Sequence, residues 1–130
     1  MNHRSDNMTP VASGVEETRP KRIRAMGEEL GTIFDAIWQK VVWLGVEIEE
    51  FTELYGKKKS RVDLANEAAS RFFYIVQTVL FRDIVLCIAR LTDRKKVSGK
   101  DNLTILRFSD LVNDPTLKSE IEVQVGRVIE

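Results

Sequence analysis

The sequence predicts an all-α protein, an up-and-down helical bundle of two long antiparallel helices and two shorter C-terminal helices. The prolines stand at positions 10, 20 and 115, so residues 21–114 lack the strongest helix breaker. Apolar residues in that stretch recur every three or four positions, the spacing of one helix face. The sequence contains no Asn-Gly or Asp-Gly pair and no regular polar–apolar alternation, so these signals of a β-hairpin are absent.

Composition is typical of one soluble domain: 130 residues, 43% hydrophobic, with a formal net charge of zero. The zero charge argues against a globally basic nucleic-acid binder. A disulfide framework is excluded because Cys87 is the one cysteine, and a multi-histidine metal site because His3 is the one histidine. We expect no metal and no cofactor. No apolar signal segment follows Arg4, so we expect a cytoplasmic protein.

Two segments divide the chain. Residues 1–20 are polar and contain two prolines, which predicts a flexible N-terminal tail. Residues 21–130 carry the helical pattern and form the predicted domain. The pattern is still periodic at Glu130, so we expect either a helix that ends there or a domain cut from a longer protein.

The first long helix is predicted from about Lys21 to Tyr55, with Gly56 ending it. Three glycines share one line along this helix, and their common side predicts the close approach of another helix. They are Gly27, Gly31 and Gly45. Trp43 lies off the apolar face, which predicts an exposed aromatic side chain. It either covers a helix crossing or contacts a partner.

The second long helix is predicted from Ser60, with Asp63 as a weakened capping box, to about Leu91. Its second half is apolar nearly all round, which is typical of a central, buried helix. We expect no membrane span, because three charged residues interrupt the apolar stretch. The stripe expected to face inward in the first half is Ala65, Ala69, Phe72, Val76 and Val79.

Asp83 and Arg90 continue that inward stripe, so two opposite charges occupy positions where apolar side chains are expected. One interpretation is a buried polar network that ties the helix, with neighbouring Arg82, to its surroundings and to Asp93. The other is a polar pocket for a ligand or nucleotide. Cys87, in the same apolar run, is expected to be a buried, unreactive thiol.

Two basic runs flank the second helix and could contact nucleic-acid phosphates. They are Lys57, Lys58, Lys59 and Arg61 before it, and Arg94, Lys95 and Lys96 after it. Alternatively they are solvated loops, the first balancing the acidic end of the first helix. A helix of about 30 residues holds them roughly 45 Å apart, so a shared nucleic-acid surface needs a dimer.

The C-terminal quarter begins with a polar loop over residues 92–102 that contains Gly99. A short helix follows, with Asn102 or Thr104 as its cap. Asp114 and Pro115 then supply an N-cap and a first-turn proline for the last helix.

The second helix and the loop after it resemble the abortive-infection U-type (AbiU-like) branch of the HEPN superfamily. The likeness is carried by DLANEAASRFFYIVQTVLFRDIVLCIARLTD and by KDNLTI, and is strongest at Ala89-Arg90-Leu91-Thr92-Asp93. The resemblance implies a helical bundle, often dimeric, in phage defence or toxin–antitoxin pairs. Many HEPN proteins are metal-independent ribonucleases with an Arg-x4–6-His motif. No histidine follows position 3 here, so that motif is missing.

We therefore expect a noncatalytic helical interaction protein, acting as a homodimer or with a cognate protein partner. Two alternatives remain open at this point. The chain is a fragment of a ribonuclease toxin whose motif lies beyond residue 130, or it is an RNA-binding regulator that uses the basic runs.

Overall fold

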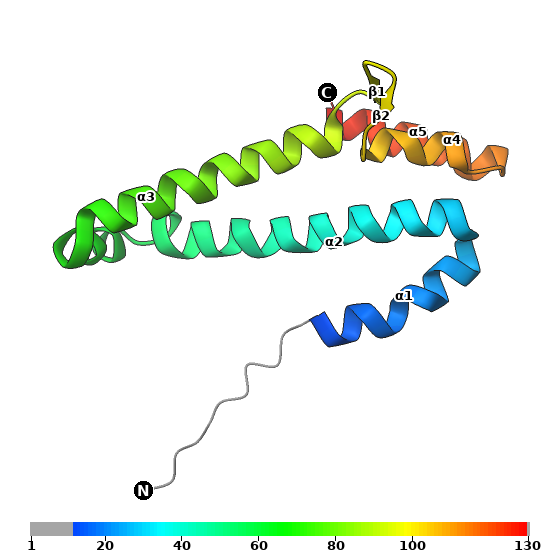
Figure 1. Ribbon diagram of the computed structural model, residues 1–130. Coiled ribbons are helices and arrows are strands. Elements are labelled where there is room, and N and C mark those ends of the chain that lie inside the picture. Colours follow the sequence, from blue (N-terminus) through cyan, green and yellow to red (C-terminus); the bar gives the residue numbers. More distant parts are fainter. Residues whose placement is uncertain (1–11, 130) are drawn as a thin grey trace, which may run out of the picture.

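The computed structural model describes residues 12–129. The expected tail therefore lies outside the described residues over positions 1–11. The remaining chain is almost entirely helical, which confirms the all-α prediction. Two long helices, α2 (Glu28–Phe51) and α3 (Lys59–Thr92), run antiparallel along the length of the molecule (Figure 1).

The connection between α2 and α3 is a π-helical turn, Thr52–Gly56. Its Tyr55 hydroxyl donates to the Phe73 carbonyl at 2.9 Å, which holds the turn against α3. Gly56 ends this helical stretch as predicted. The expected capping box does not form: α3 begins at Lys59, its N-cap Lys58 makes no side-chain hydrogen bond, and Asp63 accepts from Lys59 at 2.9 Å instead.

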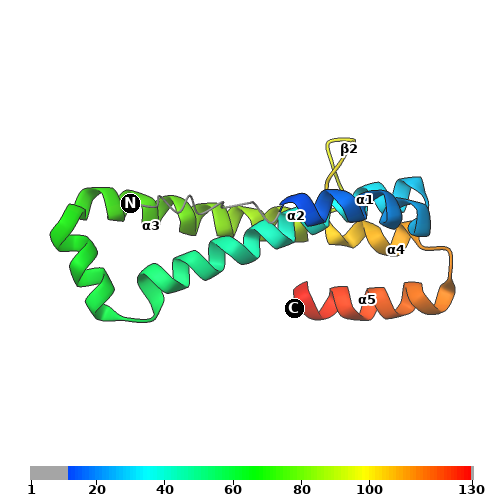
Figure 2. The same ribbon diagram turned by 90° about the horizontal axis from the view of Figure 1, so that it is seen from below.

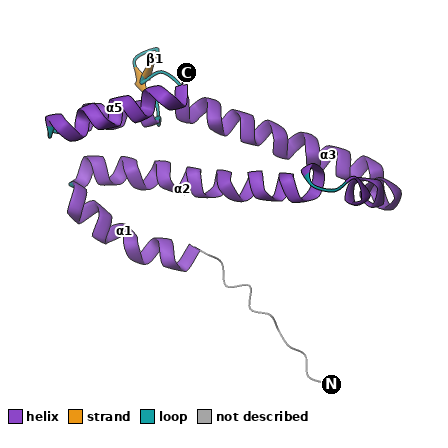
Figure 3. Cartoon of the chain, turned by 180° about the vertical axis from the view of Figure 1, so that it is seen from behind, coloured by secondary structure: helices purple, strands orange, loops and turns teal. Residues whose placement is uncertain are grey.

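An additional helix, α1 (Ala12–Met26), precedes the predicted bundle. Residues 12–20, expected to be tail, are helical and contain Pro20. The single helix predicted from residue 21 is divided at Gly27, whose φ of +84° lies in the region that glycine adopts most readily. Apolar periodicity continues across Gly27, so the pattern could not mark this break. From there α1 folds back along α2 (Figures 1 and 3).

The predicted close approach occurs at Gly31. A Cβ added there would lie 2.6 Å from the Ile23 Cα, so only glycine lets α1 and α2 pack this tightly. Gly45 has open space beside it, and Gly27 serves the chain reversal instead. The prediction is therefore confirmed for one of the three glycines.

Helix α3 is bent and largely uncovered. Ala69 has non-helical φ and ψ of −164° and 69°, and the helix changes direction there (Figure 2). The buried hydrophobic residues of the described chain are Ile37, Ile84 and Leu91. Phe72 and Val79, predicted to face inward, are 61% and 51% exposed. The prediction that α3 is a central, buried helix is wrong for the single chain, because α2 covers only one side of α3.

Helix α3 is followed by a small hairpin that the sequence pattern did not predict. Strands β1 (Lys96–Val97) and β2 (Lys100–Asp101) pair antiparallel. Ser98 and Gly99 between them both have positive φ, the backbone of a tight two-residue turn. The polar loop was predicted, but Ser-Gly is a weaker hairpin signal than Asn-Gly.

The final elements follow the prediction closely. Thr104 is the cap of a 3-10 turn, Ile105–Arg107, which continues into α4 (Phe108–Leu111). Phe108 packs against Phe34 of α2, with ring centroids 5.9 Å apart. The last helix, α5 (Pro115–Ile129), is capped by Asp114, whose side chain accepts from the Leu117 amide at 2.9 Å.

Candidate functional site

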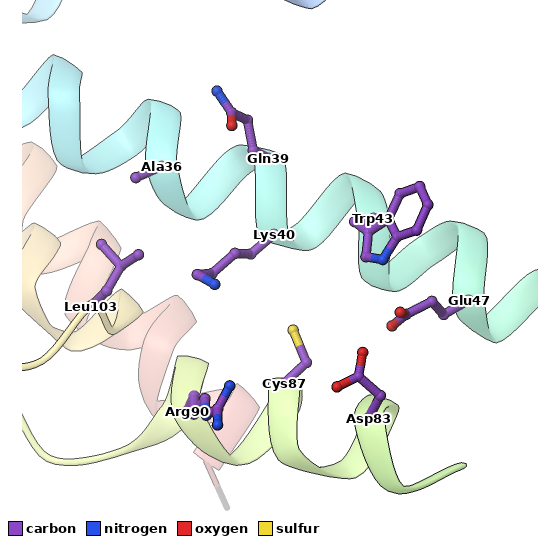
Figure 4. Close-up of a pocket in the computed structure, with 9 residues that line it drawn as sticks. All are labelled: Ala36, Gln39, Lys40, Trp43, Glu47, Asp83, Cys87, Arg90 and Leu103. Atoms are coloured by element: carbon purple, nitrogen blue, oxygen red, sulfur yellow. The ribbon is translucent and has the colours of Figure 1, made fainter. Parts of the chain in front are cut away.

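A pocket of about 440 Å³ opens between α2 and α3 (Figure 4). Helix α2 contributes five side chains, α3 contributes three, and Leu103 closes one end. The lining residues are Ala36, Gln39, Lys40, Trp43, Glu47, Asp83, Cys87, Arg90 and Leu103.

The antiparallel helices place like charges opposite one another across this pocket (Figure 4). Lys40 and Arg90 lie at one end, and Glu47 and Asp83 at the other. Trp43 lies between the two ends on α2. Seven residues separate cation from acid on each helix, which corresponds to about 10.5 Å along the axis.

Glu47 is the most enclosed charged group of the pocket, with 8% of its surface exposed. Burial raises the pKa of its carboxyl above the ordinary value, and a hydrogen bond with Asp83 and that residue's negative charge raise it further. A hydrogen bond from Trp43 acts in the opposite direction. The Glu47 carboxyl therefore holds its proton more tightly than a solvent-exposed carboxyl would.

The expected buried network of Asp83, Arg90 and Asp93 does not form. All three are exposed in the described chain, and no ion pair joins them there. Asp93 instead holds the base of the hairpin by accepting from the Arg94 amide at 2.7 Å and from the Asn102 side chain at 3.3 Å. Arg82 is exposed and lies outside the pocket. Asp83 and Arg90 line the open pocket between α2 and α3, and Asp93 follows the end of α3, so none of the three lies in a core.

The residues that form the pocket and most of the bundle match the model of a known protein family. A family model described as AbiU2, of the HEPN class, matches residues 27–127. The chain belongs to the AbiU2 branch of the HEPN superfamily. This placement makes it a HEPN-like protein associated with abortive infection, a form of phage defence. No curated protein and no solved structure shows a significant match.

The matched AbiU2 segment begins at the chain reversal, so it contains the whole pocket. Two of the predicted site residues, Asp83 and Arg90, meet there. Trp43 meets them, 63% exposed as predicted from its position off the apolar face. Its neighbours Lys40 and Glu47 were missed as site residues, because nothing in a single sequence says which residues of two helices face each other.

Cys87 lines the centre of the pocket and is only half-buried, where full burial was expected. Burial nevertheless raises the pKa of its thiol; the nearby Glu47 and Asp83 charges also raise it, while Lys40 and Arg90 lower it. The thiol form therefore dominates at neutral pH, in agreement with the predicted low reactivity.

The most deeply buried charge in the described part of this AbiU2-branch chain is Asp35, which was not predicted as a site residue. It is 1% exposed and forms ion pairs with Arg22 and, at 3.2 Å, with Arg19. The Gln39 amide donates to it at 2.9 Å. An acid within an apolar helical stretch was a visible signal, but Arg19 lay in the segment interpreted as tail.

The two basic runs are largely neutralised by acids of the same chain. Before α3, Lys57 and Arg61 both pair with Glu53, the latter at 2.7 Å. After α3, Lys95 lies 2.7 Å from Asp110, and Lys96 lies 3.5 Å from Asp101. These contacts lower the pKa of the Glu53 and Asp110 carboxyls. The arrangement favours solvated, self-balanced loops over a phosphate-binding surface.

Proposed function

We propose that this AbiU2-branch chain is a noncatalytic interaction protein of a phage-defence system, and that it works as a homodimer through α3. The noncatalytic part is supported by the chemistry of the residues present. The one histidine is His3, and the one cysteine is the protonated thiol of Cys87. No histidine lies among the pocket residues, so the pocket lacks the pairing of a cysteine nucleophile with a histidine base.

The observation that carries the dimer is the uncovered apolar stripe of α3. Beyond the bend, four large apolar side chains lie within about 60° of one another around the helix axis. Each is between 43% and 61% exposed. We name these residues, Phe72, Ile75, Val79 and Leu86, the α3 stripe.

A second copy of the chain is the occupant that this stripe fits best. Three buried hydrophobic residues make a very small core for the described chain, and covering the stripe would enlarge it. The formal net charge of zero means that two copies do not repel each other. An apolar stripe along a helix can pack against the same stripe of a second copy across a two-fold axis, which is the arrangement of a symmetric dimer.

A lipid bilayer is the competing occupant. By length and composition alone, helix α3 is long and apolar enough to cross a membrane. Its most apolar 18-residue window has a mean hydropathy of 1.8. Arg82 and Asp83 interrupt the apolar stretch, and charges near the middle of a bilayer are costly. Behaviour in solution with and without detergent separates the two occupants.

Sedimentation equilibrium of the purified full chain across micromolar concentrations tests the proposal. We expect a mass of twice 14.9 kDa without detergent. Val79→Asp in the α3 stripe should shift the equilibrium to monomer. Val123→Asp is the control, because Val123 on α5 is 52% exposed, against 51% for Val79, but lies outside the stripe.

Three results would contradict the dimer. The first is a monomer at every concentration, and the second is an equal effect of both substitutions. The third is a chain that stays in solution only with detergent and floats with phosphatidylcholine vesicles, which would assign the stripe to a membrane.

A further inference from the structure

We propose that the pocket between α2 and α3 is a docking groove for a helix of a different protein, one that carries an acidic and a basic side chain seven residues apart. Such a partner rests on the interaction role proposed above and gives that role a chemistry, but its binding does not need the homodimer. It is indicated by the spacing of the lining residues, by the unpaired charges at the two ends of the pocket and by an exposed tryptophan between them.

The pocket has the spacing of a seam into which a third helix packs. Most of its lining residues follow each helix at alternating steps of four and three, the spacing by which packed helices interlock their side chains. Two such rows side by side form a groove that a third helix can enter. The rows are Ala36, Lys40, Trp43 and Glu47 on α2, and Asp83, Cys87 and Arg90 on α3.

The groove lies open in the described chain, because α1 packs on a different side of α2. Gly31 and Asp35, which contact α1, lie roughly 130° around the α2 axis from the row that lines the pocket. The pocket is lined by residues of α2 and α3 and by Leu103, so no other helix of the described residues fills it.

The two ends of the groove require opposite charges. Lys40 faces Arg90 at one end, and Glu47 faces Asp83 at the other (Figure 4). Within the described part of the chain, none of these four side chains forms an ion pair. Facing like charges cost stability, so a partner gains most by bringing an acid to the cationic end and a base to the acidic end.

The separation of the two ends gives the spacing on the partner. Lys40 and Glu47 are seven residues apart on α2, which corresponds to about 10.5 Å along the axis. In a helix that runs along the groove, an acid and a base seven residues apart have the same separation. They also lie within about 20° of each other around the axis, so one helix face meets both ends at once.

The middle of the groove selects an apolar side chain between the two charges. Trp43 is 63% exposed there, and Cys87 opposite it is half-buried. A leucine or a similar side chain of the partner would cover both. Arginine is the best base, because its planar guanidinium can donate to both carboxyl groups, Glu47 and Asp83, and can stack on the indole.

A designed helical peptide serves as the probe. It is alanine-rich and about 20 residues long, enough to be helical, with a glutamate, a leucine three residues on and an arginine seven residues on. In a Trp38→Phe background Trp43 is the one tryptophan; Trp38 stacks on Phe34 and does not line the pocket. The peptide should shift the Trp43 emission saturably to shorter wavelength, because the leucine covers the indole.

A second peptide of the same composition is the control for spacing. Its arginine is moved two residues farther, to the opposite side of the helix from the glutamate. It should bind at least about tenfold more weakly, because one helix can no longer reach both ends of the groove.

Exchanging the charges at the cationic end should reverse the choice of peptide. The parent should prefer the glutamate–arginine peptide, and the double variant Lys40→Glu/Arg90→Glu should prefer by about tenfold a peptide with arginine at both positions. The matched control is Arg71→Glu/Arg82→Glu, which changes the net charge equally on α3 but outside the pocket and should keep the parent's preference. All four side chains are exposed, so the variants should fold, which thermal melting checks.

Acrylamide quenching of Trp43 tests whether a second copy of the chain fills the groove instead. No residue of the α3 stripe lines the pocket, so Trp43 should be quenched equally in the parent chain and in Val79→Asp. Sedimentation measures the dimer and fluorescence measures the groove, so either proposal can fail while the other holds. Protection of Trp43 in the parent that Val79→Asp removes would assign the groove to a second copy and overturn the partner helix.

Three further outcomes would overturn the proposal. The first is no saturable shift with the glutamate–arginine peptide at concentrations of about 1 mM, which corresponds to very weak affinity. The second is equal affinity for the peptide with the displaced arginine. The third is the same reversal of preference in Arg71→Glu/Arg82→Glu as in Lys40→Glu/Arg90→Glu, which would indicate diffuse charge attraction.

Discussion

Helix α2 buries two carboxyl groups, Asp35 and Glu47, and their surroundings are opposite. Asp35 meets the cations of α1 and an amide of its own helix. Glu47 meets another acid, Asp83, across a pocket. Two acidic residues of one helix thus have different roles. Asp35 joins α2 to α1 through ion pairs, whereas Glu47 lies beside another acid without a cation to pair with in the described chain. The comparison teaches that burial of a charged side chain does not by itself indicate a functional site. A buried charge whose neighbours carry the same charge is the stronger indication.

The largest effect should come from removing the compensated carboxyl. Asp35→Ala removes the ion-pair partner of the part-buried Arg22, so we expect a loss of about 3–5 kcal/mol in the free energy of unfolding. Urea denaturation measures it. Asp83→Ala should change stability by less than about 0.5 kcal/mol, because that side chain is exposed. Equal losses in the two variants would remove the distinction between the two carboxyls.

A smaller effect should distinguish the tight α1–α2 packing at Gly31 from the open position of Gly45 on α2. Gly31→Ala places a Cβ 2.6 Å from the Ile23 Cα, and we expect a destabilisation of about 1–3 kcal/mol. Gly45→Ala meets open space within the helix and should stabilise by roughly 0.5–1 kcal/mol. Thermal melts of both variants give the comparison. A Gly31→Ala protein as stable as the parent would show that α1 does not pack closely there.

The smallest effect should appear in the pH dependence of Glu47. Its folded-state pKa is raised, so ionising it costs the folded chain stability as pH rises through that value. Relative to Glu47→Gln, the parent protein should therefore lose stability toward alkaline pH. The difference should be constant below the ordinary carboxyl pKa, where the folded and unfolded states both carry the proton. Glu53 and Asp110, with lowered pKa values, act in the opposite sense but equally in both proteins.

Melting curves of the parent and Glu47→Gln proteins, recorded across that pH range, measure this difference. If the two proteins lost stability in parallel as pH rises, neither Asp83 nor burial would perturb the pKa of Glu47. The contrast between Glu47 and Asp35 would then depend on the positions of their neighbours alone.

Features set by local chemistry could be predicted from the sequence. The long helices followed from periodicity, and the start of the last helix from Asp114 and Pro115. Gly31 was correctly placed at a close helix contact. Features set by distant contacts could not be predicted in this way. The reversal at Gly27 interrupts no apolar pattern, and the bend at Ala69 has neither proline nor glycine to mark it.

The candidate site was predictable as parts, and its assembly was not. Trp43 was identified as exposed, and Asp83 and Arg90 as charges in an unexpected place. Their meeting depends on the register between α2 and α3, which the chain reversal after α2 determines. The same limit explains why Asp83 and Arg90 were assigned to a buried network. That prediction assumed that α3 is enclosed on all sides, whereas in the single chain α2 covers only one side of it.

The hairpin after α3 has a practical consequence for handling the protein. Its base is fastened three times: Thr104 donates to the Leu91 carbonyl at 2.8 Å, and Asn102 donates to the Lys95 and Arg94 carbonyls at 2.9 Å and 2.8 Å. The excursion to Ser98 and Gly99 is thus a closed side loop. Extra residues at an exposed tip add only slowly growing closure entropy. A fluorescent label or affinity tag inserted at Ser98–Gly99 therefore leaves the helices and the pocket in place.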